Sequence, residues 1–459
     1  MQKKNHVEQK GLRMAAIGNA EKDLHLNKLP AIEIIDAKEL LLKNRRFDLI
    51  FKYTYLNNHE LYKSGTNFYE DLYCEHIRAF NNFYEEYPRK ESKSDFLQHF
   101  IDNKDSIDRL GFDVNKSIIT VDENYELTDG SHRISICAFL GKRVHVRRDI
   151  SNPYYDYKFF FQRGIKEFYA DFAALEQVKL NPNAYIVSLH SVTSQESDNQ
   201  VADILNKYGF IYYKKDIDLT YNGYVNLKKI SYGFDYGENT WLGNLENDYA
   251  GAKYHTNETI GKSPLRSFVF ICDSLDKVIM AKKEIRDIYK IGNFSVHIND
   301  YREEAIELAQ TFFNKNSLWA LNKRPYNLNT NKIDGLIIEL KDWAHQNNIP
   351  LDSICASGST PFAILGIRES RDLDFLHCSN TIPYIANSTI ASHESELSYY
   401  TAHKFEIIHN PINHFYYKGI KFITLNVLKN MKKIRDEIPK DRDDIILIDN
   451  YINHECVKV

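Results

Sequence analysis

Apolar and polar residues alternate along this chain with periods that separate strands from helices. Short apolar runs between turn-forming residues, such as AYIVSLHS (184–191) and SFVFICDS (267–274), predict strands. Longer runs with an apolar residue every three or four positions, such as LDKVIMAKKEIRDIY (275–289), predict amphipathic helices. Because strands and helices of these lengths follow one another through most of the chain, we expect helices packed on sheets in a multidomain α/β (α+β) fold.

The order of the elements divides the chain into parts. The strand pattern AIEIID (31–36) opens the first structured part, which also contains a helical stretch at 66–105. Polar stretches at 150–157 and 322–332 predict two junctions. The predicted parts are a polar leader at 1–28, a first domain at 29–150, a middle domain at 180–322 and a C-terminal domain at 333–459. The last domain is expected to be rich in strands to about residue 425, and its charged stretch at 429–444 predicts a solvated helix and its end.

Composition and charge disfavour two kinds of partner. The chain has a formal net charge of −4, so bulk charge does not predict a nucleic-acid or membrane-surface partner. No apolar run approaches the roughly 20 residues that span a bilayer, and the N-terminal residues lack the apolar core of a signal peptide. The six cysteines are scattered, which is typical of a reduced, cytoplasmic protein. The sequence leaves the oligomeric state open.

The first chemical motif is DGSHR, where a strand delivers Asp129 and Gly130 into a turn and Ser131, His132 and Arg133 begin a helix. The N-terminus of a helix has unpaired N–H groups and partial positive charge, so it accepts phosphate. An arginine adds a bidentate phosphate donor. The alternative is an Asp-Gly turn with a capping serine and a solvated His-Arg pair.

This motif, with the apolar helix and basic strand that follow it, resembles the ParB/sulfiredoxin superfamily, whose members often carry Asp-Gly-x-His-Arg. The resemblance covers about 30–148. It implies a ParB/sulfiredoxin-like fold and phosphate or nucleotide binding more firmly than any one reaction.

The second motif places His297 and Asp300 at the end of a strand, before the acidic helical pattern YREEAIELAQTFF. The order of elements over 184–315, the corner KYGF and the His-x-x-Asp spacing resemble nucleoside diphosphate kinase. The resemblance implies a ferredoxin-like middle domain with His297 as a phosphate-accepting nucleophile. The family's Lys-Pro-Asp and Gly-Thr-Ile-Arg segments are missing here, so the same fold with altered chemistry is the alternative.

A long polar and basic stretch, 240–266, lies between these elements and is expected to be a loop. Its lysines, His255 and Arg266 are candidate phosphate contacts. A solvated loop is the alternative.

The third motif lies in SGSTPFAILGIRESRDLDF (357–375). Asp372 and Asp374 are two residues apart on a predicted strand, so their carboxylates share one face. Two such carboxylates suit Mg²⁺, which also takes phosphate oxygens and assists phosphoryl or nucleotidyl transfer. Gly358 and Ser359 precede the pair by about fourteen residues, which fits one short helix between two strands and lets the backbone approach phosphate. The alternative is an acidic turn.

The Gly-Ser pair, helix and Asp-x-Asp resemble the nucleotidyltransferase superfamily, and in particular its LicD-type branch, although the fuller acidic motif of that branch is missing. The resemblance covers about 335–459. It implies a nucleotidyltransferase fold, Mg²⁺, a nucleotide donor such as ATP or CTP, and a sugar- or polyol-phosphate substrate of surface-polysaccharide synthesis. Arg371 is a candidate phosphate ligand, and Glu406, in KFEII, is a candidate third acid on a later strand.

These motifs together favour a Mg²⁺-dependent enzyme that transfers a phosphoryl, nucleotidyl or substituted-phosphate group during capsule or lipopolysaccharide synthesis. Two alternatives stay open: a non-catalytic nucleotide-binding regulator, and a DNA-associated ParB-like protein or toxin-type nucleotidyltransferase.

Overall fold

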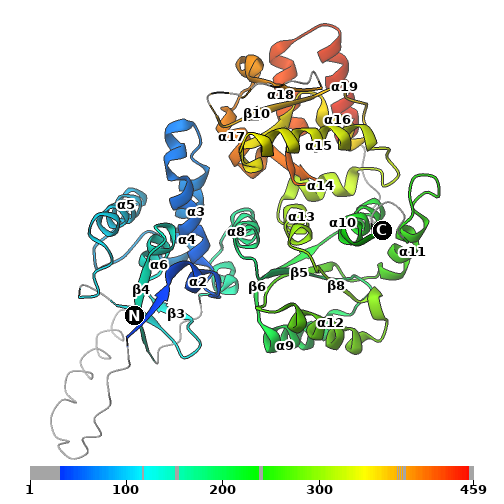
Figure 1. Ribbon diagram of the computed structural model, residues 1–459. Helices are drawn as coiled ribbons and strands as arrows, with labels where there is room; N and C mark the ends of the chain where they lie inside the picture. Colours follow the sequence, from blue (N-terminus) through cyan, green and yellow to red (C-terminus); the bar gives the residue numbers. More distant parts are fainter. Residues whose placement is uncertain are drawn as a thin grey trace, which may run out of the picture.

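The computed structural model contains three small mixed or antiparallel sheets with helices packed on them (Figure 1). It describes residues 32–453, except 116–117, 150–154, 237–240, 380, 382, 384 and 386–388. The predicted polar leader lies outside the described residues. The mixed α/β class expected from the sequence is confirmed.

The first sheet has the strand order β1-β4-β2-β3. Its strands are β1 (Glu33–Asp36), β2 (Ile119–Val121), β3 (Leu127–Asp129) and β4 (Arg143–Arg148). β4 is parallel to β2 and antiparallel to β1, and β3 is antiparallel to β2. The helices of this part are α2 (Ala37–Leu42), α3 (Asp48–Asn58), α4 (Phe68–Asn81), α5 (Lys93–Leu110) and α6 (Ser131–Phe139). The predicted order of strand, turn, strand, turn, helix and strand at 117–148 is confirmed for the described residues.

The helical stretch expected at 66–105 is two helices. α4 ends where Asn82 takes a left-handed conformation with φ of 53°, and α5 begins after Ser92, whose hydroxyl accepts a hydrogen bond from the Asp95 N–H. Asparagine tolerates the left-handed region and serine is a favoured N-cap, so local sequence causes the break.

The middle sheet has the order β6-β7-β5-β8, with every neighbouring pair antiparallel. Its strands are β5 (Ala184–Leu189), β6 (Phe210–Ile217), β7 (Leu265–Ile271) and β8 (Val296–Ile298). The helices are α9 (Asp198–Tyr208), α10 (Tyr221–Tyr236), α11 (Ala250–Thr259), α12 (Leu275–Tyr289), α13 (Arg302–Phe312) and α14 (Lys315–Lys323). The stretch expected to be one loop at 240–266 therefore contains a helix, α11.

Both faces of the middle sheet are covered. Phe268 and Phe270 of β7 belong to the core under α9 and α12, whereas Val269 and Ile271 belong to the core on the opposite face. Because neighbouring strand residues point to opposite faces, a strand covered on both faces is apolar throughout. The FVFI run of β7 has this property.

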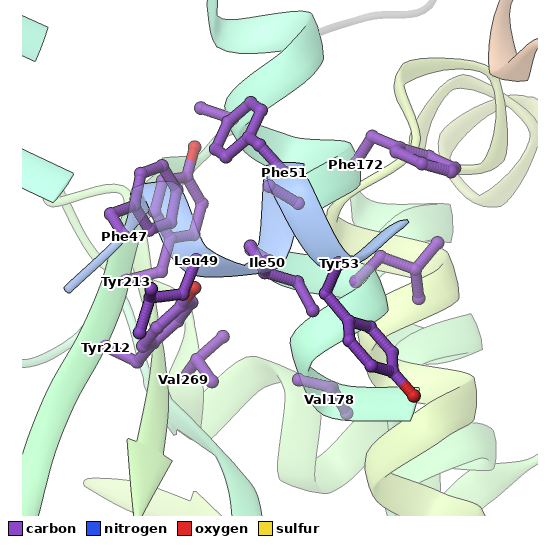
Figure 2. Packing of buried hydrophobic residues seen from close by; sticks show 14 of the residues in the cluster. Phe47, Leu49, Ile50, Phe51, Tyr53, Phe172, Val178, Tyr212, Tyr213 and Val269 are labelled. Carbon is purple, nitrogen blue, oxygen red and sulfur yellow. The ribbon is translucent and has the colours of Figure 1, made fainter. Parts of the chain in front are cut away.

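The first and middle sheets share one continuous hydrophobic core. α7 (Tyr157–Gln162) and α8 (Glu167–Leu180) connect the two parts of the chain. The ring of Phe47, next to α3, stacks on the ring of Tyr213 in β6, with 5.8 Å between their centroids. Figure 2 shows Phe47, Leu49 and Ile50 facing Tyr212, Tyr213 and Val269 of the middle sheet. Burial of one such aromatic side chain contributes about 1.5–3 kcal/mol, so this contact stabilises both parts together.

The C-terminal sheet has the order β11-β10-β9-β13-β12 and its own hydrophobic core. Its strands are β9 (Ile354–Ser357), β10 (Leu373–His377), β11 (Ile390–Ser392), β12 (His414–Tyr417) and β13 (Ile420–Ile423). The helices are α15 (Asn331–Gln346), α16 (Thr360–Leu365), α17 (Lys404–His409), α18 (Leu425–Arg435) and α19 (Lys440–Asn453). Short 3₁₀ helices complete the described chain: η1 (His59–Ser64), η2 (Gln195–Ser197), η4 (Gly292–Phe294), η5 (Leu351–Ser353), η6 (Glu394–Tyr399) and η7 (Pro411–Asn413).

The strand expected at KFEII is the helix α17, so that prediction is wrong. The buried side chains of α17 are Lys404, Ile407 and Ile408, which have the three- and four-residue spacing of a helix face. The paired isoleucines suggested a strand, but this spacing decides for a helix.

No helix within the described parts of the chain is long and apolar enough to cross a membrane.

Candidate functional site

The strongest candidate site lies where β9 ends and β10 begins. The two strands are antiparallel, with Asp374 opposite Ser357. Gly358 follows β9 with φ of 58°, and a Cβ atom at that position would overlap Oδ2 of Asp374 and lie 3.1 Å from its Cγ. Because Gly358 has no side chain, there is room for the Asp374 carboxylate next to it. The Gly-Ser pair and the Asp-x-Asp motif, which are separated in the sequence, are therefore in contact in the structure.

The carboxylates of Asp372 and Asp374 act on each other. Burial, followed by the negative charge of Asp372, raises the pKa of Asp374 to about 6, and the charge of Arg435 opposes the rise. Two carboxylates that share a site repel each other in this way. The predicted placement of both acids together is consistent with this repulsion. Glu396 of η6 also acts on Asp374 and adds a third negative charge.

Glu406, the acid predicted to complete the pair, is engaged elsewhere. Its Oε2 accepts a hydrogen bond of 2.6 Å from the Thr66 hydroxyl, and its Oε1 accepts one of 2.6 Å from the Asn410 amide. Since it lies on α17 and not on a strand, it connects the C-terminal part to the loop before α4. Glu396 is the better candidate for a third acid.

His393 is a site residue that sequence reasoning missed. Its Nδ1 lies 3.1 Å from the Ser357 hydroxyl and 3.0 Å from the Tyr400 hydroxyl. Burial lowers the pKa of His393 to about 4, although the charge of Glu396 opposes this. The neutral imidazole fixes the end of β9 next to Gly358. The feature of the sequence that could have indicated a role for His393 is its position directly after a strand, β11. Many histidines without a functional role have such a position.

The two arginines of the α16–β10 loop differ in role. Arg368 makes a bidentate pair with Asp444, at 2.9 and 2.8 Å, and its guanidinium lies over the Phe362 ring. Arg371, the predicted phosphate ligand, is exposed beside Asp372. Ser359 is the N-cap residue of α16 and its side chain caps no backbone N–H there. Arg371 and Ser359 are therefore available to a ligand, whereas Arg368 stabilises the fold.

A buried ion-pair network supports the site from α18 and α19. Lys432 lies 3.0 Å from Asp441 and 2.8 Å from Asp444, and Arg435 lies 2.7 Å from Asp441. Asp441 is fully buried and Lys432 is nearly so. The charged stretch at 429–444, expected to be solvated, is exposed at most of its positions but buried at Lys432, Asp441 and Asp444, where that expectation is wrong. The network holds Arg435 where its charge acts on Asp374.

The carboxylate pair could hold a magnesium ion if water and a substrate supplied the other ligands. No group of three or more His, Cys, Asp or Glu side chains among the described residues is arranged to hold a metal ion. Mg²⁺ is commonly bound by one or two carboxylates, with water and substrate phosphate as the other ligands. A divalent cation would also relieve the repulsion between Asp372 and Asp374 that raises the pKa of Asp374.

The variant Gly358→Ala tests this geometry. We expect it to weaken Mg²⁺ binding at least about tenfold, because the added Cβ displaces the Asp374 carboxylate. Its left-handed φ adds a strain of about 1–2 kcal/mol. Gly366→Ala is the matched control, since Gly366 has φ of 74° and its nearest neighbour is a Leu328 side chain at 3.3 Å. Thermal unfolding with and without Mg²⁺ measures both effects, and equal Mg²⁺ responses in the two variants would contradict the assignment.

The DGSHR residues contact one another around the start of α6. Arg133 pairs with Asp129 at 2.8 Å, and Gly130 precedes the helix with φ of 100°. His132 Nε2 lies 3.1 Å from the Tyr73 hydroxyl, and burial lowers its pKa well below the usual range. The Ser131 hydroxyl accepts a hydrogen bond of 3.1 Å from Lys52 Nζ. The predicted strand–turn–helix setting is confirmed, and phosphate binding there stays a prediction.

His297 lies on β8, as predicted, but its side chain is buried. Its Nε2 is paired with Glu304 of α13, and its ring lies against Tyr232 with 4.8 Å between centroids. Asp300 forms an ion pair with Lys282 at 3.0 Å. A histidine that accepts phosphate needs an accessible ring nitrogen. The burial of His297, which is 4% exposed, therefore counts against that role.

A second buried pair in the middle part was not found from sequence. Lys228 Nζ lies 3.2 Å from His190 Nε2, and both side chains are almost fully buried. Burial lowers the pKa of both groups well below their usual ranges.

Arg266 and Lys253, two of the candidate phosphate contacts in 240–266, are engaged within the fold. Arg266 is fully buried and donates to Thr193 Oγ1 at 2.8 Å and Asp198 Oδ1 at 3.1 Å. Lys253 pairs with Asp248 at 2.5 Å. Burial lowers the pKa of His255 to about 3, which keeps its ring neutral.

The chain was compared with protein-family models, curated proteins and solved structures, and none of the three comparisons found a match.

Proposed function

We propose that this protein is a Mg²⁺-dependent enzyme that transfers a nucleotidyl, phosphoryl or substituted-phosphate group from a nucleotide such as CTP or ATP to a sugar- or polyol-phosphate acceptor. The observation that carries the proposal is the contact between Gly358 and Asp374, with Asp372 repelling Asp374 beside it. A glycine that opens the backbone next to two carboxylates suits a metal-bound phosphate. Surface-polysaccharide synthesis as the setting rests on the LicD-type resemblance.

The order of the strands supports two further parts of this proposal, a ferredoxin-like fold for the middle part and a nucleotidyltransferase fold for the C-terminal part. The middle strands follow one another as β5-α9-β6 and β7-α12-β8, in the antiparallel order β6-β7-β5-β8. This is the β-α-β-β-α-β pattern of a ferredoxin-like fold, with α10 and α11 inserted at its centre. In the C-terminal part, β9, α16 and β10 give the Gly-Ser, helix and Asp-x-Asp order of a nucleotidyltransferase fold.

In this proposal the residues of the chain have separate tasks. Asp372 and Asp374 hold Mg²⁺, which when bound neutralises phosphate charge. Gly358 and Ser359 bring the backbone close to the donor phosphates, and Arg371 donates hydrogen bonds to them. His393 keeps the end of β9 in place through Ser357. Glu396, whose charge acts on Asp374, accepts the proton of the acceptor hydroxyl in this proposal.

A non-catalytic nucleotide-binding protein is the second candidate. The observation that favours it is the lack, among the described residues, of a third ligating side chain grouped with the two aspartates. The burial of His297 also removes one catalytic role from the middle part.

The test is nucleotide conversion by the full chain with Mg²⁺. CTP and ATP are each incubated with a sugar phosphate and a polyol phosphate, and transfer products are separated and quantified. We expect conversion with Mg²⁺ and none with EDTA. Nucleotide binding without conversion of any donor–acceptor pair would refute the enzyme and support the second candidate.

A further inference from the structure

A cavity with a volume of about 450 Å³ lies between the middle and C-terminal parts of the chain. Its walls come from α10, α13 and α14 on one side, and from α15 and the β12–β13 hairpin on the other. This volume is in the range of pockets that hold small organic ligands. None of the catalytic, metal-binding or phosphate-binding residues predicted from the sequence lines this cavity.

Four basic side chains line this cavity: Lys229, Arg324, Lys341 and Lys418. Asp334 and Glu307 are the acidic side chains of the lining, so the formal charge is positive. Asp334 is already satisfied by Lys418 at 2.8 Å, by the Tyr417 hydroxyl at 2.9 Å and by the Thr330 hydroxyl at 2.8 Å.

The basic groups act on one another across the cavity. Burial, together with the charges of Arg324 and Lys418, lowers the pKa of Lys229 to about 7. Burial also lowers the pKa of Lys341, with Glu307 opposing and Lys418 adding to the effect. Lys229 and Lys341 are therefore close enough to other cations of the lining to be destabilised by them as charged groups, which a bound anion would reverse.

Arg324 carries the strongest evidence for a ligand. It is 8% exposed, and its guanidinium lies over the Tyr417 ring at 4.6 Å. Within the described parts of the chain, no side chain or backbone oxygen accepts a hydrogen bond from this guanidinium, and no carboxylate pairs with it. A buried arginine without an anionic partner is costly. Its planar donors match the oxygens of a phosphate.

Two further groups in the lining lack partners among the described residues. Lys341 has no ion pair or hydrogen bond from its ammonium group there. The side-chain oxygen of Gln310, which is 4% exposed, has no hydrogen-bond partner. Leu321, Leu328 and Ile364 add an apolar wall that suits the organic part of a ligand.

The cavity is separate from the Asp372–Asp374 site. β12 lies three strands from β10 in the sheet, which is about 14 Å at the usual strand spacing. β13 is parallel to β9, so the turn with Lys418 lies at the end of the sheet opposite to Gly358.

We propose that this cavity binds a small organic phosphate, with the phosphate against Arg324 and Lys341 and the organic part against the apolar wall. Such a ligand contacts the middle and C-terminal parts at once, so binding stabilises their relative position. The inference is independent of the proposed transfer reaction.

Calorimetric titration of the full chain in EDTA tests the proposal, with inorganic pyrophosphate and glucose 1-phosphate as probes and glucose as the uncharged control. We expect both phosphates to bind and to raise the unfolding temperature, and glucose to do neither. Lys341→Gln and Arg324→Gln are expected to weaken binding at least about tenfold. Two control variants are expected to bind both phosphates as the wild type does. Lys283→Gln removes one positive charge from an exposed position on α12, and Asp374→Asn changes the separate carboxylate site.

Lys341→Gln breaks no ion pair, so it provides the test even if Arg324→Gln fails to fold. The proposal is overturned if neither phosphate binds. It is also overturned if Lys341→Gln binds the two phosphates as tightly as the wild type does. Loss of phosphate binding in Asp374→Asn, with binding retained in Lys341→Gln, would likewise overturn it.

Discussion

Replacing Asp374 with asparagine is expected to slow Mg²⁺-dependent transfer at least about 1000-fold and, at the same time, to stabilise the fold at pH 7. The loss of activity follows from the proposed function. Removing one of two metal carboxylates forfeits several kcal/mol of charge stabilisation in the transition state, and about 4 kcal/mol corresponds to 1000-fold.

The gain in stability follows from the pKa of Asp374, which burial and Asp372 raise from 3.8 to about 6. A carboxyl whose folded-state pKa is raised binds its proton more tightly when folded, so its ionisation destabilises the fold. This cost develops as pH rises from about 4 to about 6 and is complete above that. Asparagine removes a cost of about 1–3 kcal/mol after allowance for partial exposure of the site.

Chemical unfolding of both proteins at pH 7 and pH 4, in EDTA, measures this effect. The variant should be more stable at pH 7, and the difference should shrink at pH 4, where the wild-type carboxyl is protonated. Added Mg²⁺ should stabilise the wild type alone. A variant that is less stable at pH 7 and still responds to Mg²⁺ would show that Asp374 is a structural acid.

Replacing Asp441 with asparagine is the second change with a large expected effect, a loss of about 3–5 kcal/mol in the free energy of unfolding. Asp441 is fully buried and pairs with Lys432 and Arg435. Its loss leaves the buried Lys432 with Asp444 as its one remaining ion-pair partner among the described residues and removes the shortest ion pair of Arg435. Although burial alone would raise it, hydrogen bonds from Arg435 and Lys432 hold the pKa of Asp441 well below its usual range.

The sign of the pH dependence differs from that of Asp374. A lowered folded-state pKa contributes stability above the unfolded-state value of about 4, and this stability is lost as pH falls below it. Urea unfolding at pH 7 should therefore show a large difference between wild type and Asp441→Asn, and the difference should narrow towards pH 3. Asp443→Asn is the control, since Asp443 is exposed and lies two residues after Asp441 on the same helix, α19. Similar losses in both variants would mean that helix α19, and not the ion-pair network, is responsible.

The sequence predicted the elements well where local pattern and tertiary setting agree. The strands β5 and β7 and the helix α12 are confirmed, because each has an unambiguous period or a run bounded by turn residues. The turn at Gly130 was also predicted, since its positive φ is one that glycine favours. For Gly358 the sequence predicted an approach to phosphate, whereas the contact found in the structure is with the Asp374 carboxylate.

Three of the failures concern contacts between residues far apart in the chain, whereas the misassigned segments α11 and α17 are errors in reading the local pattern. Glu396 and His393 reach the site through η6 and the residue before it, and no motif marks them. The sequence predicts a solvated stretch at 429–444 because its charges are many. The ion pairs of Lys432 with Asp441 and Asp444 form only when α18 and α19 pack together. The lining of the basic cavity comes from α10, α13, α14, α15, α16 and β12, so no local pattern reveals it.

The stacking of Phe47 on Tyr213 has a practical consequence for dissecting this chain. A fragment that stops near residue 150 would leave the aromatic side chains around Phe47 in water, because their partners are supplied by β6 and α8. A fragment that starts at Asn331 keeps most of a separate core. Biochemical work on isolated pieces should therefore divide the chain once, in the segment between α14 and α15, and treat everything before that point as one inseparable unit.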